Sequence, residues 1–337
     1  TCDSTGLPSN GLFISYDYGV FWYPAFDTSY SDVEGVAISS NGQYQTTVIN
    51  NGNIFLSSDY GNIWKNVIQN NTIDLSYVDI AMSATGQYQT TIANPNIILV
   101  SNDYGRNWYQ IQLEGVSNDV YWSKIAISAT GKYQTAVTNG SKLFYSTNYG
   151  RTWFYNTSTP TATWTGIAIS YDGKHQAATA YNDYVYLSYD YGYSWSTVRD
   201  FTYSLNNWTV VGMSANGKYI VVGAVNNILG TNTESLYVSI KYGEPGSWYQ
   251  INNPSASNNI FKSIAMSADG KYITLLNNND YIFYSVTPEI NMFLSNDMNV
   301  YGDSYLNNRL SIIGDVSLNS RLIVVADISF NRRLFVG

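Results

Sequence analysis

The sequence predicts an all-β fold: a six-bladed β-propeller over residues 1–288, followed by a stalk or oligomerisation segment of short β-repeats over residues 289–337. Three observations lead to this prediction. Two phrases recur with a period of about 44 residues, Asn-Gly and Asp-Tyr-Gly turns separate runs of alternating residues, and a twelve-residue repeat follows. The composition agrees, because 16% of the 337 residues are aromatic and only 12% are charged.

The first phrase, which we name the turn phrase, reads SSDYGNIW at residues 57–64. It returns as SYDYGVFW, SNDYGRNW, STNYGRTW and SYDYGYSW, and in a degenerate sixth copy as SIKYGEPGSW. The second, which we name the hairpin phrase, reads IAMSATGQYQTTI at residues 80–92 and has six copies in alternation with the first. A period of 40 to 50 residues is typical of propellers and solenoids.

One repeat, residues 36–68, contains four short runs of strand-forming residues between turn signals. Four-stranded meanders repeated around an axis make a β-propeller. The chain begins with a turn phrase and ends its last repeat without one, so we expect the N-terminal strands to complete the blade that begins near residue 264. Seven segments resemble a third strand, which keeps a seven-bladed propeller as an alternative.

The pattern S-x-D-x-G-x-x-W resembles the Asp-box, or BNR repeat, of sialidase-like β-propellers, over residues 12–286. We expect its Ser and Asp to bond turn amides, its Gly to permit a positive φ and its Trp to pack on the hairpin. These duties are structural. The positions concerned are Asp17, Gly19, Trp22, Asp59, Gly61, Trp64, Asp103, Gly105, Trp108, Asn148, Gly150, Trp153, Asp190, Gly192 and Trp195.

The resemblance makes sialidase the first enzyme to test, and that activity implies three arginines around the substrate carboxylate. Arg106 and Arg151 lie in turn phrases, and only Arg199 remains in the propeller, because the other arginines are C-terminal. We therefore expect no catalytic residues and no enzymatic activity. The alternative is another glycoside hydrolase, which needs two placed carboxylates from the set Asp79, Asp119, Glu114 and Glu34.

The single cysteine, Cys2, and the single histidine, His175, leave no basis for an internal disulfide or a Cys/His metal site. His175 occupies the position that is tyrosine in the other hairpin phrases, so we interpret it as a packing substitute. We predict no metal and no cofactor.

Five of the six repeats have an aromatic residue four positions before the small residue of the first strand, and the first repeat has Val33 there. The five are Tyr77, Trp122, Trp164, Trp208 and Phe261. In a propeller this segment enters the innermost strand on the face opposite the turn phrases. The rings are candidates for stacking on sugars, with packing between blades as the alternative.

The net charge of −8, without a basic run, argues against nucleic acid, and no apolar stretch predicts membrane insertion. From residue 291 the period becomes twelve, as in DSYLNNRLSIIG and DVSLNSRLIVVA. Such units must stack on copies or on other chains. They resemble repeats in fibre-like surface proteins of large viruses and phages, which implies association with other subunits, such as a homotrimer.

The sequence thus predicts a non-enzymatic structural or adhesion protein, a virion fibre or surface component in an extracellular or virion-surface location. Its propeller head would bind a host-surface glycan. The alternatives are a glycoside hydrolase of sialidase-like fold and a scaffold propeller that binds another protein.

Overall fold

The computed structural model describes residues 11–17, 21–25, 33–50, 52–68, 75–113, 120–201, 206–228, 231–251, 261–277, 282–286 and 291–294. The chain divides into two compact units, residues 1–298 and 299–337, and all described residues lie in the first. These residues form strands and turns, with no helix among them. The all-β prediction is therefore confirmed for this part of the chain.

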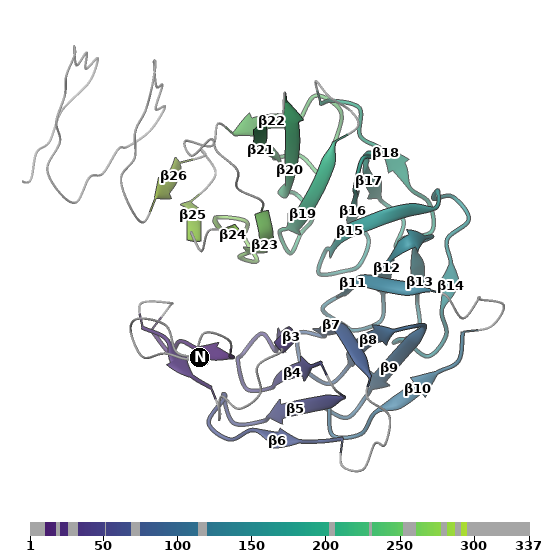
Figure 1. Ribbon diagram of the computed structural model, residues 1–337, viewed down its shortest axis with the longest axis vertical. Helices are drawn as coiled ribbons and strands as arrows, with labels where there is room; N and C mark the ends of the chain where they lie inside the picture. Colours follow the sequence, from purple (N-terminus) through teal and green to yellow (C-terminus); the bar gives the residue numbers. More distant parts are fainter. Residues whose placement is uncertain are drawn as a thin grey trace, which may run out of the picture. The chain divides into compact units, whose positions relative to one another are not determined.

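Four-stranded antiparallel sheets follow one another along the sequence, and we number them in that order (Figure 1). The first three are β3 (Val33–Ile38), β4 (Gln45–Ile49), β5 (Asn53–Ser57) and β6 (Lys65–Asn66); β7 (Ser76–Met82), β8 (Gln89–Asn94), β9 (Ile97–Ser101) and β10 (Tyr109–Ile111); and β11 (Tyr121–Ile127), β12 (Gln134–Ser141), β13 (Phe144–Ser146) and β14 (Phe154–Tyr155). The next three are β15 (Ala162–Ile169), β16 (Gln176–Ala180), β17 (Val185–Ser188) and β18 (Ser196–Thr197); β19 (Asn207–Met213), β20 (Ile220–Ile228), β21 (Thr231–Ser239) and β22 (Trp248–Ile251); and β23 (Phe261–Met266), β24 (Tyr272–Asn277), β25 (Ile282–Val286) and β26 (Asn291–Leu294). The third and fourth sheets are joined by pairing of β12 with β15.

The first strands of successive sheets lie against one another, in the order β3, β7, β11, β15, β19 and β23. The turns that follow these strands are linked by backbone hydrogen bonds from each sheet to the next: Ser40 N to Ala84 O, Ala84 N to Ala129 O, Ala129 N to Tyr171 O, Tyr171 N to Ala215 O and Ala215 N to Ala268 O. This arrangement, with inner strands side by side and meanders running outward, is that of a propeller.

Two polar and aromatic contacts recur between neighbouring sheets. Thr90 on β8 donates its hydroxyl hydrogen to Oε1 of Gln134 on β12 at 2.7 Å, and Thr46 and Gln89 repeat this bond. The tyrosines of the first three hairpin phrases each contact the tyrosine of the next sheet's turn phrase, as Tyr133 does Tyr191 with ring centroids 4.4 Å apart. His175 stacks on Tyr242 at 5.0 Å in the same way, so it does the packing of the tyrosine that it replaces.

The N-terminal strands do not complete the last sheet in this structure. Strands β1 (Phe13–Ile14) and β2 (Tyr23–Pro24) form a two-stranded sheet of their own. Strand β24 pairs with β25, and β25 with β26, so the outer positions of the sixth sheet are already filled. The first of the two compact units ends at Met298, so it includes β26.

Candidate functional site

The turn phrases share one hydrogen-bonding pattern. In the first complete repeat, the Ser57 hydroxyl donates to Oδ1 of Asp59 at 2.8 Å and accepts a hydrogen bond from Gly61 N at 2.9 Å. Oδ1 of Asp59 also accepts from Ile63 N, and Trp64 Nε1 donates to Gly61 O. The backbone N–H of Ile63, with the Ser57 hydroxyl, lowers the pKa of Asp59 below its usual range. The Asp is therefore an ionised cap of a turn.

The other copies follow the same plan. Asp103 and Asp190 hold their turns as Asp59 does, and Asn148 accepts a hydrogen bond from Thr152 N at 3.0 Å in their place. Asp17 accepts from Phe21 N, whereas Gly19 lies outside the described residues. The indole donors of Trp108, Trp153 and Trp195 bond to Gly105, Gly150 and Gly192. Trp22 is 54% exposed.

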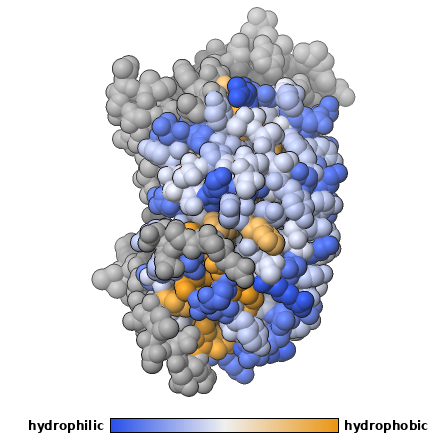
Figure 2. Space-filling view, turned by 90° about the vertical axis from the view of Figure 1, so that its right-hand side faces the viewer, coloured by the Kyte–Doolittle hydropathy of each residue, from blue (hydrophilic) through white to orange (hydrophobic). Residues whose placement is uncertain are grey.

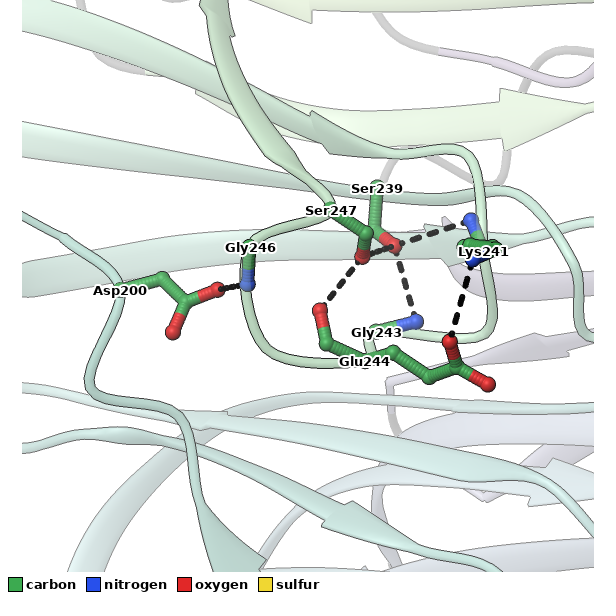
Figure 3. A network of polar contacts seen from close by, with 7 residues as sticks. All are labelled: Asp200, Ser239, Lys241, Gly243, Glu244, Gly246 and Ser247. Carbon is green, nitrogen blue, oxygen red and sulfur yellow. Dashed lines mark hydrogen bonds and ion pairs between the residues drawn. The ribbon is translucent and has the colours of Figure 1, made fainter.

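The degenerate sixth copy replaces the Asp by Lys241 and rebuilds the network with other groups (Figure 3). The Ser239 hydroxyl still accepts from Gly243 N at 2.8 Å, but its second partner is the Ser247 hydroxyl at 2.7 Å. Ser247 in turn donates to Glu244 O, and Lys241 forms an ion pair with Glu244 at 3.7 Å. A hydroxyl thus takes over the bridging role of the missing carboxylate.

The five aromatic residues expected to stack on sugars lie inside the protein: Tyr77, Trp122, Trp164, Trp208 and Phe261 are each at most 2% exposed. Trp164 Nε1 donates to Ser141 O, and Trp208 Nε1 donates to Asp183 O, each at 2.9 Å. These acceptors belong to the neighbouring sheet, so the rings pack between sheets. The position of a ring in the repeat does not reveal whether the next sheet covers it, and here no ring face is open for a ligand.

One charged pair lies on the innermost strands. Oδ2 of Asp79 on β7 accepts a hydrogen bond from Ile125 N at 3.1 Å and lies 3.9 Å from Nζ of Lys124 on β11. The Asp79 side chain is 15% exposed, and burial raises its pKa even though Lys124 acts in the opposite direction. On the other side it packs against β3, where a Cβ at Gly35 would lie 3.2 Å from Cα of Asp79.

The remaining carboxylate candidates are not assembled around Asp79 in the part of the chain that the structure describes. Glu34 is exposed on β3, beside Gly35, whereas Glu114 and Asp119 lie outside the described residues. Arg199, the propeller arginine outside the turn phrases, has its Cζ 5.6 Å from the centroid of the Tyr184 ring. Within the described ranges, no group of three or more His, Cys, Asp or Glu side chains is arranged to hold a metal ion. The same residues contain no helix long and apolar enough for a membrane span.

A cluster of three aromatic rings, two of them exposed, lies where the third and fourth sheets meet. The Tyr145 ring on β13 is 6.0 Å from that of Phe154 on β14 and 5.4 Å from that of Tyr193, with centroids compared in both cases. Phe154 and Tyr193 are 54% and 53% exposed. Partial burial, and then the neighbouring Tyr193, raise the pKa of Tyr145. We name these three residues the aromatic cluster.

The aromatic cluster is held by buried polar contacts. The Asn156 side chain, 1% exposed, donates to Gly192 O at 2.7 Å and Tyr193 O at 3.0 Å. These bonds tie the turn phrase of the fourth sheet to the third. The outer strands β14 and β18 border this side in Figure 1, and the face that Figure 2 shows there is mostly hydrophilic with small hydrophobic patches. None of the three rings is among the residues that the sequence predicted to contact a ligand.

A sequence signal for the cluster does exist. The residue before the serine of a turn phrase packs against the glycine of the next turn phrase, as Val100 does against Gly150 and Leu187 against Gly243. Tyr145 is the aromatic residue at this position in the third sheet, and Tyr193 directly follows the glycine of the next turn phrase. The repeat therefore predicts that the two rings meet.

Comparisons with known proteins agree on the fold. No protein-family model matches the chain, and none of the curated proteins matches it either. Among solved structures, YCF48 bound to D1 peptide is similar with a TM-score of 0.59 and 13% identity, over 79% of this chain and 82% of that one. The GH74 xyloglucanase from Xanthomonas campestris has a TM-score of 0.65 and 10% identity over 82% of this chain. The Niastella koreensis GH74 enzyme has a TM-score of 0.65 and 16% identity, also over 82% of this chain.

These likenesses correct one expectation. Two of these three structures are GH74 enzymes. The prediction of no enzymatic activity, which rested on the missing arginines, was therefore wrong. This chain spans 49% of the length of each of these two enzymes, and at 10% and 16% identity the likeness shows the fold alone. The described part of the chain is a β-propeller.

Proposed function

We propose that this chain is a carbohydrate-binding propeller whose ligand stacks on the aromatic cluster of Tyr145, Phe154 and Tyr193. The observation that carries the proposal is the contact of three rings, two of them more than half exposed, at a junction fixed by the buried Asn156. Sugar rings bury their C–H faces on such aromatic surfaces, and nearby polar groups bond the hydroxyls.

The rigidity of the cluster favours binding. Tyr193 is held through its backbone carbonyl by Asn156, and Tyr145 is held by strand pairing with Phe154 opposite it. A ring that is already fixed loses little conformational entropy when a ligand binds. Only 12% of the residues of the whole chain are charged, a composition that agrees with an uncharged ligand such as a sugar.

The test is isothermal titration with xyloglucan oligosaccharides, together with a glycan array for host-surface sugars. We expect Phe154→Ala and Tyr193→Ala each to weaken binding by about tenfold or more, or ~1.4 kcal/mol. Tyr109→Ala is the matched control, because Tyr109 is 57% exposed on the corresponding outer strand of the second sheet. Equal affinities for Tyr109→Ala and Tyr193→Ala, or capture of a tight protein partner that sugars do not displace, would contradict the proposal.

Glycoside hydrolysis is the second candidate, and Asp79 favours it. A shielded carboxyl group with a raised pKa is suited to act as a general acid, and the second carboxylate that hydrolysis needs would come from Glu114 or Asp119, which lie outside the described residues. The fold likeness to the GH74 enzymes supports this choice of reaction. Reducing-end release from xyloglucan should be lost in Asp79→Asn and kept in Asp269→Asn. Full activity in Asp79→Asn would exclude this candidate.

We further propose that the propeller is the head of an extracellular or virion-surface appendage, in which the C-terminal repeats join other subunits as a trimer. The twelve-residue period in the sequence supports this, because such units must stack on copies of themselves or on other chains. Light scattering should give a trimer for residues 1–337 and a monomer for residues 1–298. The same number of chains per particle for the two proteins would contradict a role of the repeats in assembly.

A further inference from the structure

The first and the sixth sheets each present an uncovered face, unlike the sheets between them. On β3, Val36 and Ile38 are 54% and 59% exposed, whereas the residue equivalent to Val36 in the second sheet, Ile80, is 4% exposed. On β24, Tyr272 and Leu276 are 57% and 38% exposed. Side chains at these positions are covered by a neighbouring sheet elsewhere in the propeller.

The internal interfaces follow one apolar pairing rule. A second-strand residue of one sheet shares a core cluster with a first-strand residue of the next. Val48 and Ile80 form such a pair, and Ile92 and Ile125 form another. In the phase of the repeat, Leu276 takes the place of Val48, and Val36 takes that of Ile80. The two uncovered faces thus carry the two halves of this pair.

A polar pairing rule is more specific. Thr hydroxyls donate to Gln Oε1 across the first three interfaces, as from Thr135 to Gln176 at 2.6 Å. In the next two interfaces both members are apolar, and they share core clusters: Ala177 with Ile220, and Val221 with Ile273. Threonine and glutamine are thus present together or replaced together.

The same rule applies to the two ends. On β24 the residue at the threonine position of the repeat is the exposed Thr274, whereas the two preceding sheets have apolar residues at that position. In the first sheet the residue at the glutamine position is Gln45. Tyr272 and Tyr60, 57% and 51% exposed, stand at the positions of the stacked tyrosine pairs. We propose that the face of β24 binds the face of β3 and β4 in the same chain and closes a ring of six sheets, with Thr274 donating to Gln45.

The N-terminal hairpin supports a sheet at this place. Ile14 on β1 packs against Gly61, as Val100 packs against Gly150 and therefore as a third strand packs on the following sheet. Strand β1 thus already holds the third-strand position of the sheet that precedes the first one. In the closed ring β1 lies beside β24, in the place that β25 takes in this structure.

Chemical cross-linking tests the closure. Gln45→Cys and Thr274→Cys are combined in a Cys2→Ser background of the full chain and treated at low protein concentration with a short bifunctional maleimide. Thr90→Cys with Gln134→Cys is the matched control, since that pair meets at 2.7 Å within the structure. We expect an intrachain cross-link in both variants, identified by mass spectrometry of the linked peptides.

Two results would overturn the proposal. The first is the absence of a cross-link between positions 45 and 274 while the control pair reacts, which is the result expected if a seventh blade lies between the two ends. The second is a cross-link that joins two copies of the chain. If the cysteine variants lose their near-ultraviolet circular dichroism, the readout becomes the free energy of unfolding of Gln45→Ile, Thr274→Val and the double variant. Coupling comparable to that of the Thr90 and Gln134 pair would support closure, and simple additivity would refute it.

Discussion

The hydrogen bond between Thr90 and Gln134 is the contact whose loss the structure defines most closely. Both side chains are buried, Thr90 at 0% and Gln134 at 1% exposure, and the hydroxyl lies 2.7 Å from Oε1. Nε2 of Gln134 donates to Gly131 O of its own turn at 3.0 Å. One amide therefore joins the second sheet to the turn of the third.

Removing either partner should be costly. Thr90→Val leaves the Gln134 oxygen buried without its donor, which costs about 1–3 kcal/mol. Gln134→Ile strands the Thr90 hydroxyl and removes the bond to Gly131 O, which costs about 2–4 kcal/mol. The double variant reproduces the kind of apolar pair that Ala177 and Ile220 form, so it should cost about 1–2 kcal/mol less than the sum of the single changes.

The assay is urea unfolding of the four proteins, compared at a common slope of free energy against urea concentration. Thr90→Val combined with Gln176→Ile is the control, because these residues are not partners and their effects should add to within about 0.5 kcal/mol. If the effects of Thr90→Val and Gln134→Ile also add within that margin, then the two side chains do not depend on each other and the pairing rule fails.

Three further predictions follow from single positions. Gly131→Ala places a Cβ 2.6 Å from Cβ of Tyr88 at a φ of 82°, so we expect its free energy of unfolding in urea to fall by about 2–4 kcal/mol. Gly140→Ala should lose only about 1 kcal/mol, because its φ is 85° but nothing lies within 4 Å. Equal losses would show that the Tyr88 side chain moves aside. Asp79→Asn should gain stability relative to the parent protein as the pH rises. Because the pKa of Asp79 is raised in the folded state, the stability that this carboxyl group contributes is fully present below its ordinary pKa of about 3.9 and is lost as the pH rises through the folded-state pKa. Unfolding curves of both proteins at about pH 3 and about pH 7 measure the difference, and a variant that becomes less stable relative to the parent at about pH 7 would contradict this sign. Trp164→Ala removes a ring that is 1% exposed and should lower the free energy of unfolding by about 3–5 kcal/mol, whereas a near-neutral result would mean that the ring is free for a ligand.

The repeat predicted the strands and turns well because their determinants are local. The Ser57 to Asp59 turn depends on residues within one phrase, and its hydrogen bonds are those that side chains of this kind make to nearby amides. One feature of the turns does not follow from the local pattern: Tyr104 has a φ of 65°, although tyrosine seldom adopts positive values. Its stacking with Tyr44 of the preceding sheet, at 4.6 Å, is the contact that accompanies this conformation.

The candidate site was harder to predict because exposure depends on the neighbouring sheet. Trp164 and Tyr193 are both aromatic residues at fixed positions of the repeat, yet one is 1% and the other 53% exposed. The difference arises because Trp164 enters an inner strand that two sheets cover, whereas Tyr193 lies in a turn at the outer junction with β13. Phase within a repeat identifies the strand and face of a residue, and only the contacts between repeats decide whether a ligand can reach it.

Pairwise replacement across the interfaces carries information that a single repeat lacks. A consensus derived from one repeat would put threonine and glutamine in every sheet, and the apolar residues Ala177 and Ile220 would look like unrelated deviations. Considered as a pair, they remove a buried donor and a buried acceptor together, which avoids the cost of leaving either one unsatisfied. By the same reasoning, Thr274 and Gln45 have kept their polar groups because each has a partner, and the partner that the phase of the repeat supplies to each is the other.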